Sequence, residues 1–201
     1  MVDLAGDIVS IYQEHADEWD RTRGRTLFEK QWLDRFLTLC DGSADILDIG
    51  CGGGEPIAAY LLSQGHRVTG IDSSAPLIER CRVRFPQGRW LLGDMRTMQF
   101  EAAFSGLIAW DSFFHLSFND QRAMFPLFGK LARPGAGLMF TSGPDHGKAI
   151  GRLLDRQLYH ASLSPEEYQG LLNKAGFDIV DFVPNDPDCG GHSVWLARRR
   201  A

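Results

Sequence analysis

The sequence predicts an α/β protein, in which helices cover both faces of a mostly parallel sheet. Short β-rich runs alternate with helical patterns, and Gly, Asp or Pro marks each change. Several of the runs are apolar without clean alternation, which is typical of parallel strands buried on both faces. The predicted strands are 45–49, 67–71, 90–92, 106–110, 137–141, 177–183 and 193–197.

The last two of these runs predict an antiparallel hairpin at the end of the sheet. They flank the turn-rich segment NDPDCGG at residues 185–191. The complete sheet is therefore expected to have seven strands, with the last one reversed.

Helices are predicted between the strands, at 56–64, 75–85, 121–131 and 165–174. The last has the most complete boundary signals. Ser164 is placed as N-cap, Pro165 at the first helical position and Glu167 three residues after the cap, while Gly176 follows the end.

Length and charge restrict the class of protein. A chain of 201 residues can bury about 70% of its surface in one core, so a single domain over residues 1–201 is expected. The 21 basic and 26 acidic residues give a net charge of −5, which disfavours nucleic acid as a partner.

Targeting and cysteine patterns predict a cytoplasmic protein that contacts no membrane. No apolar run approaches the roughly 20 residues that span a bilayer, and the first residues lack the layout of a secretory signal. Because the four cysteines form no C-x-x-C pair, neither a zinc site nor a disulfide framework is expected, and no metal is predicted.

A glycine-rich turn follows the first predicted strand and precedes a helix. Its sequence, residues 50–56, is GCGGGEP. Glycines permit positive φ and lack the Cβ that would keep a ligand from the backbone, and a helix start offers free N–H groups. The turn therefore predicts a site for a nucleotide-like ligand.

Acidic residues end the next two predicted strands. Asp72, 22 residues after Gly50, can accept both hydroxyls of a ribose. Asp94 suits the exocyclic amine of an adenine, with Met95 as its apolar cover. Each feature alone also fits a tight connection or an N-cap, but three in succession at carboxyl ends predict the binding crevice of an open α/β sheet.

The turn distinguishes between nucleotides. Glu55 stands where the NAD fingerprint has its third glycine, and no Gly-Lys-Ser or Gly-Lys-Thr follows, as a P-loop requires. Glu55 and Asp72 would also repel a polyphosphate. A cationic adenosine ligand fits best, and an NAD-binding oxidoreductase is kept as an alternative.

With these motifs in order, residues 46–141 resemble the Rossmann-like core of class I S-adenosylmethionine-dependent methyltransferases. The resemblance implies a three-layer α/β/α sandwich that uses S-adenosylmethionine and releases S-adenosylhomocysteine. It implies that the glycine-rich turn cradles the methionine portion and that the fourth strand end closes on the cofactor. The core residues expected to bind the cofactor are Asp48, Gly50, Gly52, Gly54, Asp72, Ser73, Asp94, Met95, Trp110 and Asp111.

The N-terminal residues add a second resemblance, to the lid of small-molecule methyltransferases related to glycine N-methyltransferases. It rests on Tyr12, Trp19 and Arg25, and it implies a helical lid over 1–40 and a core over 41–201. Trp19 would cover the site, and Arg25 would grip the cofactor's carboxylate through a charge-assisted fork. Arg21 and Arg23 lie in the same basic cluster, which leaves open which arginine serves.

The acceptor is expected to be a small molecule. The segment WDSFFHL at 110–116 lacks the Asn/Asp-Pro-Pro-aromatic motif of methylases that flip a base. His115 is the candidate catalytic base, with packing among phenylalanines as the alternative. Tyr12, His146, Tyr159 and His160 are candidate substrate contacts, the last three in a substrate loop, and His192 can reach the same mouth.

The sequence therefore predicts an enzyme that transfers a methyl group from S-adenosylmethionine to a small-molecule acceptor, as a monomer or homodimer. Besides the NAD-binding oxidoreductase, a non-catalytic module that binds S-adenosylmethionine is an alternative.

Overall fold

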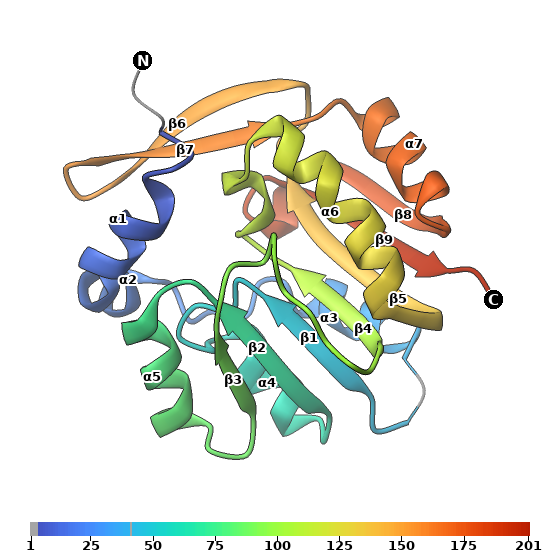
Figure 1. Ribbon diagram of the computed structural model, residues 1–201, viewed down its shortest axis with the longest axis horizontal. Helices are drawn as coiled ribbons and strands as arrows, with labels where there is room; N and C mark the ends of the chain where they lie inside the picture. The colour runs from blue at the N-terminus through green and yellow to red at the C-terminus, as the bar shows by residue number, and fades with distance from the viewer. Residues whose placement is uncertain (1–3, 41) are drawn as a thin grey trace.

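A seven-stranded sheet forms the centre of the computed structural model, which describes residues 4–40 and 42–201 (Figure 1). Its strand order is β3-β2-β1-β4-β5-β9-β8. Strands β1 to β5 pair in parallel, whereas β9 is antiparallel to both β5 and β8. The bounds are β1 (Asp45–Ile49), β2 (Arg67–Asp72), β3 (Arg89–Leu92), β4 (Phe104–Ala109), β5 (Ala132–Ser142), β8 (Phe177–Asp186) and β9 (His192–Arg199). The predicted fold class, including the reversed last strand, is confirmed.

The register of the central strands determines where a site can form. Asp48 of β1 lies opposite Gly70 of β2 and Ile108 of β4. The chain adds strands outward from β1 to β3 on one side and from β4 to β5 on the other. A crevice therefore opens at the carboxyl ends of β1 and β4, where the strand order reverses.

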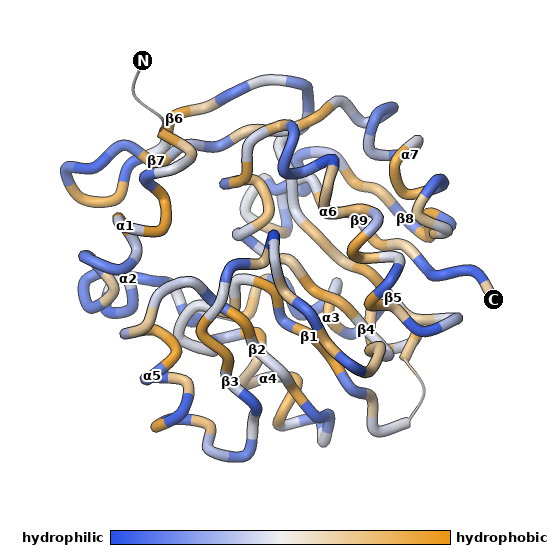
Figure 2. The backbone as a smooth tube through the Cα atoms, in the orientation of Figure 1, coloured by the Kyte–Doolittle hydropathy of each residue, from blue (hydrophilic) through white to orange (hydrophobic). Residues whose placement is uncertain are grey.

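Helices cover both faces of the sheet. Helices α3 (Lys30–Leu37), α4 (Ile57–Ser63) and α5 (Ala75–Arg84) contribute to one buried apolar cluster. Helices α6 (Phe118–Leu131) and α7 (Pro165–Lys174) contribute to the other, on the opposite face. Figure 2 shows hydrophobic residues concentrated on these strands and helices, with hydrophilic stretches on the outer connections. This is the three-layer arrangement that the apolar runs predict.

The N-terminal helices do not all belong to a lid. Helices α1 (Ile8–Glu14) and α2 (Ala16–Thr22) lie beside the carboxyl edge of the sheet (Figure 1). In α3, however, Leu33 and Phe36 are fully buried in the cluster that contains Leu61 and Ile78. The packing therefore places α3 in the core, although the predicted lid boundary at residue 40 includes it.

A second hairpin replaces the substrate loop predicted after the fifth strand. It consists of β6 (Gly147–Leu153) and β7 (Arg156–Ser162), which pair antiparallel. Its turn holds Leu154 at φ 54° and contains none of the Gly or Asn that usually marks such a turn, so the sequence carries no clear signal for it. Helix α1 packs on this hairpin through Ile8 and Ile11.

The predicted helix boundaries are confirmed at α7 and shifted at α6. The Ser164 hydroxyl accepts a hydrogen bond from the Glu167 backbone N–H at 3.2 Å, as its N-cap assignment requires. Helix α6 begins at Phe118, three residues before the predicted start, because Ser117 caps it by accepting from the Asp120 N–H. Two short 3₁₀ turns, η1 (Phe113–His115) and η2 (Pro187–Cys189), complete the elements.

Among the described residues, no helix is both long enough and apolar enough to cross a membrane.

A buried hydrogen-bond network joins α6, α7 and the end of β7. Gln121, which is fully buried, donates to the Ala161 carbonyl at 2.8 Å and accepts from the Tyr168 hydroxyl at 2.6 Å. The same hydroxyl accepts from the Leu163 N–H at 3.0 Å. Each polar group has a partner, so the network fixes α7 against α6 without leaving an unsatisfied buried atom.

Replacing Tyr168 with Phe is expected to lower the free energy of unfolding by about 1–3 kcal/mol, because Gln121 and the Leu163 N–H lose their partner in a buried site. Urea unfolding measures the change. The matched control is Tyr60→Phe, which removes an exposed hydrogen bond to Asp34 and should cost less than about 1 kcal/mol. Equal effects of the two variants would contradict the role of the network.

Candidate functional site

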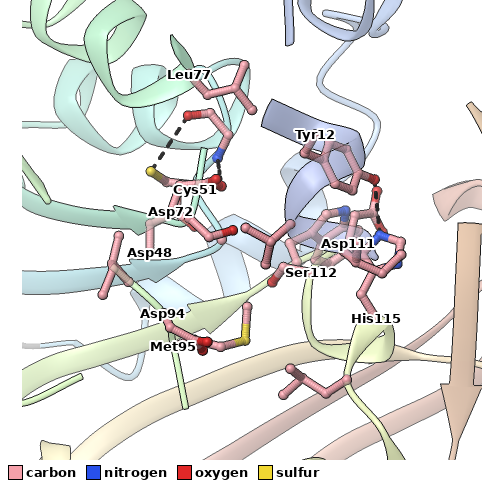
Figure 3. A pocket seen from close by; sticks show the side chains of 18 of the residues that line it. Tyr12, Asp48, Cys51, Asp72, Leu77, Asp94, Met95, Asp111, Ser112 and His115 are labelled. Atoms are coloured by element: carbon pink, nitrogen blue, oxygen red, sulfur yellow. Dashed lines mark hydrogen bonds between the residues drawn. The ribbon is translucent and has the colours of Figure 1, made fainter. Parts of the chain in front are cut away.

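A cavity of about 1060 Å³ opens to solvent at the carboxyl ends of β1 to β4 (Figure 3). Most of the predicted site residues line it: Tyr12, Trp19, Asp48, Gly50, Gly52, Asp72, Ser73, Asp94, Met95, Trp110, Asp111 and His115. The tertiary structure therefore brings together residues from across the first 115 positions of the chain.

The glycine-rich turn passes close beneath the end of β4. Gly50 has φ 77°, and a Cβ at this position would overlap the Ser112 side chain. The N–H groups of Gly50 and Cys51 both donate to the Ile71 carbonyl, at 2.8 and 3.1 Å. These contacts hold the turn under the cavity, and only glycine meets both the steric and the conformational requirement at position 50.

Asp72, at the end of β2, is oriented by the backbone. One carboxylate oxygen accepts from the Gly52 N–H at 2.9 Å and the other accepts from the Ser74 N–H at 2.8 Å. Burial raises the pKa of Asp72, while these hydrogen bonds lower it. Because each carboxylate oxygen has a second lone pair, Asp72 can still accept two hydroxyls from a ligand.

Asp48 lies deeper in the cavity and is only 4% exposed. Among the described residues, none donates a hydrogen bond to its carboxyl group. Burial raises the pKa of Asp48 to about 7, the Arg23 guanidinium opposes this shift and Asp72 adds to it. A buried carboxyl group without a partner is suited to a cationic ligand.

Asp94 faces the cavity at the end of β3, but Arg96 holds its carboxylate. The Arg96 Nε donates to both Asp94 carboxylate oxygens at 3.0 Å, and the backbone N–H of Arg96 donates to one of them at 2.8 Å. These hydrogen bonds lower the pKa of Asp94. A ligand amine at Asp94 would have to share the carboxylate with Arg96, which also lines the cavity.

An ion cluster holds α2 against the glycine-rich turn and α5. Asp20 is 6% exposed and accepts from Arg84 at 2.7 and 2.5 Å, with Arg80 at 3.3 Å and Arg25 at 3.5 Å. The Arg84 hydrogen bonds lower the pKa of Asp20. A carboxylate this buried requires such partners, so the cluster fixes the position of α2.

Trp19 extends from α2 over the turn. A Cβ on Gly52 would lie 2.6 Å from the Trp19 ring, so glycine is needed for this approach. Tyr12 contacts Trp19 edge to face, with ring centroids 5.8 Å apart. Two of the three residues on which the predicted lid rests, Tyr12 and Trp19, therefore line the cavity.

Of the arginines in the N-terminal basic cluster, Arg23 lines the cavity, whereas Arg21 and Arg25 do not. Arg25 donates to the Glu55 carboxylate at 2.8 Å and is 44% exposed. Arg23 lies over the Trp19 ring, 5.1 Å from its centroid, and donates to the Glu55 carbonyl at 3.1 Å. The two arginines are close together in the sequence, so the sequence does not show which one faces the cavity. The direction of the chain after the end of α2 decides this.

His115 and Tyr12 form a hydrogen-bonded pair on the opposite side of the cavity from Cys51 (Figure 3). The His115 Nδ1 lies 2.9 Å from the Tyr159 carbonyl, an acceptor, so Nδ1 carries the proton. Its Nε2 then accepts from the Tyr12 hydroxyl at 3.0 Å. Burial lowers the pKa of His115 to about 4, which leaves the ring neutral at pH 7.

Asp111 lines this cavity and pairs with His192, which lines a second cavity. It adopts φ 51°, and its carboxylate pairs with the His192 Nε2 at 2.8 Å. The His192 Nδ1 lies 2.7 Å from the Cys189 carbonyl, so both ring nitrogens face acceptors and the imidazolium form is favoured. The hydrogen bond to Asp111 raises the pKa of His192 accordingly.

Four predicted residues lie outside the first cavity besides Arg25. Gly54, at φ 83°, packs against Phe85 and Cys81 and shapes the turn from behind. Tyr159 is buried against α1, and its carbonyl orients His115. His146, which immediately precedes β6, and His160, which lies in β7, line a second cavity of about 900 Å³ instead.

The sequence did not indicate two further features of the structure. Glu29 is 1% exposed but lines neither cavity, and among the described residues one of its carboxylate oxygens has no hydrogen-bond partner. Burial raises the pKa of Glu29. The pairing of Asp111 with His192 was also unpredicted, since 81 positions separate the two residues along the chain. No short-range pattern identifies either.

Comparison with known families and proteins agrees with this geometry. A family model described as a methyltransferase domain matches residues 46–135. The chain is 28% identical over 169 residues to malonyl-[acyl-carrier protein] O-methyltransferase of Salmonella typhimurium, covering 81% of this chain and 62% of the relative. It is 30% identical over 147 residues to O-methyltransferase cnsE of Penicillium expansum, covering 68% and 52%. The chain thus spans less than two thirds of the length of these curated relatives.

Solved structures show the same fold. One is the Burkholderia thailandensis 1,6-didemethyltoxoflavin-N1-methyltransferase with bound 1,6-didemethyltoxoflavin and S-adenosylhomocysteine. It matches with a TM-score of 0.72 and 24% identity over 98% of this chain and 88% of that structure. Residues 46–135 thus match a methyltransferase domain, and the sheet order and the glycine-rich turn at the end of β1 give the chain the fold of the matching methyltransferase structure.

Proposed function

We propose that this protein binds S-adenosylmethionine in the first cavity and transfers its methyl group to a small-molecule acceptor, with S-adenosylhomocysteine as the second product. The observation that carries the proposal is the arrangement of Gly50, Asp72 and Asp94 around one cavity, under the cover of Trp19. The family match and the names of the relatives support the same activity.

The residues of the cavity fit this cofactor chemically. The Asp72 carboxylate has lone pairs for both ribose hydroxyls, and the backbone orients it for this role. Asp48 offers a buried carboxylate to the positive charge of the methionine portion, and Arg23 offers a guanidinium to its carboxylate. Asp94 and Met95 would hold the adenine, and Ser73, Trp110 and Asp111 complete the set.

When bound, the cofactor supplies a methyl group that the sulfonium already activates, so that a lone pair of the acceptor forms the new bond while the carbon–sulfur pair returns to sulfur. The protein then has to align the acceptor and exclude water. The cover of Tyr12 and Trp19 suits the second task. The ion cluster around Asp20 keeps this cover in place.

We propose that His115 lines the first cavity as a hydrogen-bonding partner of Tyr12 and does not act as a strong base. Its lowered pKa, about 4, makes it a weak proton acceptor, and its Nε2 already accepts from Tyr12. The pair can position an acceptor or a water through the Tyr12 hydroxyl. The prediction that His115 removes a proton from the acceptor stays a prediction.

The alternatives have less support. An NAD-binding oxidoreductase would need to place a pyrophosphate beside Asp48, Glu55 and Asp72, which all line the cavity. A non-catalytic binding module would need no acceptor site, yet a second cavity adjoins the first. The net charge of −5 supports a small molecule over nucleic acid as acceptor. The cytoplasmic location and the oligomeric state, monomer or homodimer, stay predictions from the sequence.

Replacing Asp72 with Ala is expected to weaken the binding of S-adenosylmethionine by about 2–3 kcal/mol, since the ribose would lose hydrogen bonds to a charged acceptor. Isothermal titration calorimetry measures the affinity. A matched control is Asp178→Ala on β8, an exposed carboxylate that lines neither cavity and should leave binding unchanged. Because Asp72 also satisfies two backbone N–H groups, a thermal melt of the free variant must show that it folds. Unchanged affinity in a folded variant would reject the site.

The affinity for S-adenosylmethionine is expected to rise by about tenfold between pH 5.5 and pH 7. In the free protein the pKa of Asp48 is about 7, so the group is mostly protonated at pH 5.5. A bound cation favours the carboxylate and lowers this pKa, so binding at the lower pH must release a proton. Titrations in two buffers of different ionisation enthalpy detect that proton. Asp48→Asn should abolish the dependence, and equal wild-type affinity at both pH values would contradict the assignment.

A further inference from the structure

Two cysteine side chains lie in contact behind the glycine-rich turn. Cys51 lines the first cavity and is 8% exposed, whereas Cys81 of α5 is fully buried. The two thiols are hydrogen-bonded to each other. The Cys81 Sγ also donates to the Gly52 carbonyl at 3.1 Å. The Cys51 Sγ lies 3.8 Å from the same oxygen (Figure 3). Two thiols in contact with each other are arranged for oxidation to a disulfide.

The Gly52 peptide connects the two thiols to the cofactor site. Its N–H donates to the Asp72 carboxylate at 2.9 Å, and among the described residues no backbone N–H donates to its carbonyl. The Cys81 thiol therefore satisfies a buried acceptor of the turn. Oxidation would remove the hydrogen of this thiol and leave the carbonyl unpaired, so that the turn would no longer be held in its position at Asp72.

The backbone around the two sulfurs leaves them little room to move alone. A Cβ on Gly54, in the turn, would lie 3.3 Å from the Cys81 Sγ. A Cβ on Gly70, in β2, would lie 2.7 Å from the Cys51 Sγ. When the sulfurs approach each other to form a bond, the backbone that contacts them has to move as well. A disulfide would therefore change the arrangement that holds the turn at Asp72.

The other two cysteines lie elsewhere in the fold. Cys40 is more exposed than Cys51, but it contacts the Ser105 carbonyl at 3.4 Å and lines neither cavity. Cys189 is 1% exposed and lies in η2. Exposure alone therefore predicts that Cys40 is oxidised first, whereas the geometry predicts that Cys51 and Cys81 react with each other.

We infer that Cys51 and Cys81 form a reversible disulfide under oxidising conditions and that this disulfide weakens the binding of the cofactor in the first cavity. The oxidant is hydrogen peroxide, which is small enough to reach Cys51 through the cavity that this residue lines. The effect on the cofactor rests on the proposed function, whereas the disulfide itself does not.

The oxidation takes place in two steps. The Cys51 sulfur attacks one peroxide oxygen, and the O–O bond breaks to leave a sulfenic acid and one water. The Cys81 sulfur then displaces the hydroxyl group of the sulfenic acid, which leaves with the Cys81 proton as a second water while the S–S bond forms. Overall, the two thiols lose two electrons and two protons, and the peroxide is reduced to two waters.

The reaction is expected to be slow and to depend on whether the cavity is filled. The hydrogen bond to Cys81 and burial raise the pKa of Cys51, so little thiolate is present at pH 7. A ligand in the cavity would also bar peroxide from Cys51. With S-adenosylhomocysteine at ten times its Kd, about one molecule in eleven has an empty cavity, so disulfide formation should slow about tenfold.

The test uses the full-length protein, first fully reduced and then exposed to hydrogen peroxide. Free thiols are blocked with an alkylating reagent, and disulfides are mapped by mass spectrometry. Because trypsin leaves Cys40 and Cys51 in one peptide, residues 36–67, the mapping is also done in the Cys40→Ser variant. We expect a peptide pair that is joined through Cys51 and Cys81 and has lost two hydrogens, with Cys40 and Cys189 still alkylated in the wild type.

Calorimetry then compares the affinity of the reduced and oxidised proteins for S-adenosylhomocysteine. Oxidation should weaken binding about tenfold, as expected for the loss of one buried hydrogen bond, and dithiothreitol should restore it. Cys81→Ser keeps a donor to Gly52 but cannot form the disulfide, so its affinity should not change with peroxide. Cys189→Ser is the matched control, since it retains both cysteines of the pair and should respond as the wild type does.

The failures are distinguishable. If no disulfide joins Cys51 to Cys81, the inference is overturned while the proposed function stands. If the disulfide forms and the affinity is unchanged, the effect on the cofactor is overturned. A loss of affinity that dithiothreitol does not reverse also overturns it, because oxidation of Met95 in the same cavity would give that result. If the reduced wild-type protein does not bind S-adenosylhomocysteine, the proposed function fails, while the disulfide can still be mapped.

Discussion

The parallel register of β1 between β2 and β4 is the constraint on which the rest of the site depends. It brings the ends of three strands to one edge, so that Asp48, Asp72 and the segment after β4 surround a common space. The turn after β1 must then pass directly under Ser112, where a Cβ on Gly50 would overlap it. The strand pairing thus determines both the position of the turn and the position of the cavity. A change in register would move the carboxylates away from the glycines.

Charged side chains determine the structure around the cavity at the carboxyl edge of the sheet. Buried or partly buried carboxylates line the first cavity, and Asp111 of this cavity is paired with His192, which lines the second cavity. The cover over the first cavity also depends on charge, because the buried Asp20 holds α2 to α5 through Arg84. Apolar packing forms the layers beneath, while ion pairs and hydrogen bonds position the segments that enclose a ligand.

Prediction from the sequence succeeded where local chemistry matches the final structure. The β-rich runs became the strands of the central sheet, and Ser164 caps α7 as its pattern predicts. It failed where a local signal was weak. The β6–β7 hairpin turns at Leu154 without Gly or Asn, and so its strands were predicted as a loop. For α3, an amphipathic helix fits a lid as well as a core, and only burial of Phe36 against the sheet decides between them.

The sequence by itself determined the fold class, the glycine-rich turn and the acids at the strand ends, because periodicity, turn residues and the order of motifs are local properties of the chain. Only the tertiary structure decided that Arg23 rather than Arg25 enters the cavity, that Tyr159 and Tyr12 set the tautomer of His115, and that His192 pairs with Asp111. Those choices depend on contacts between residues far apart in the chain. The burial that sets the pKa values of Asp48 and His115 also arises only when the layers pack together.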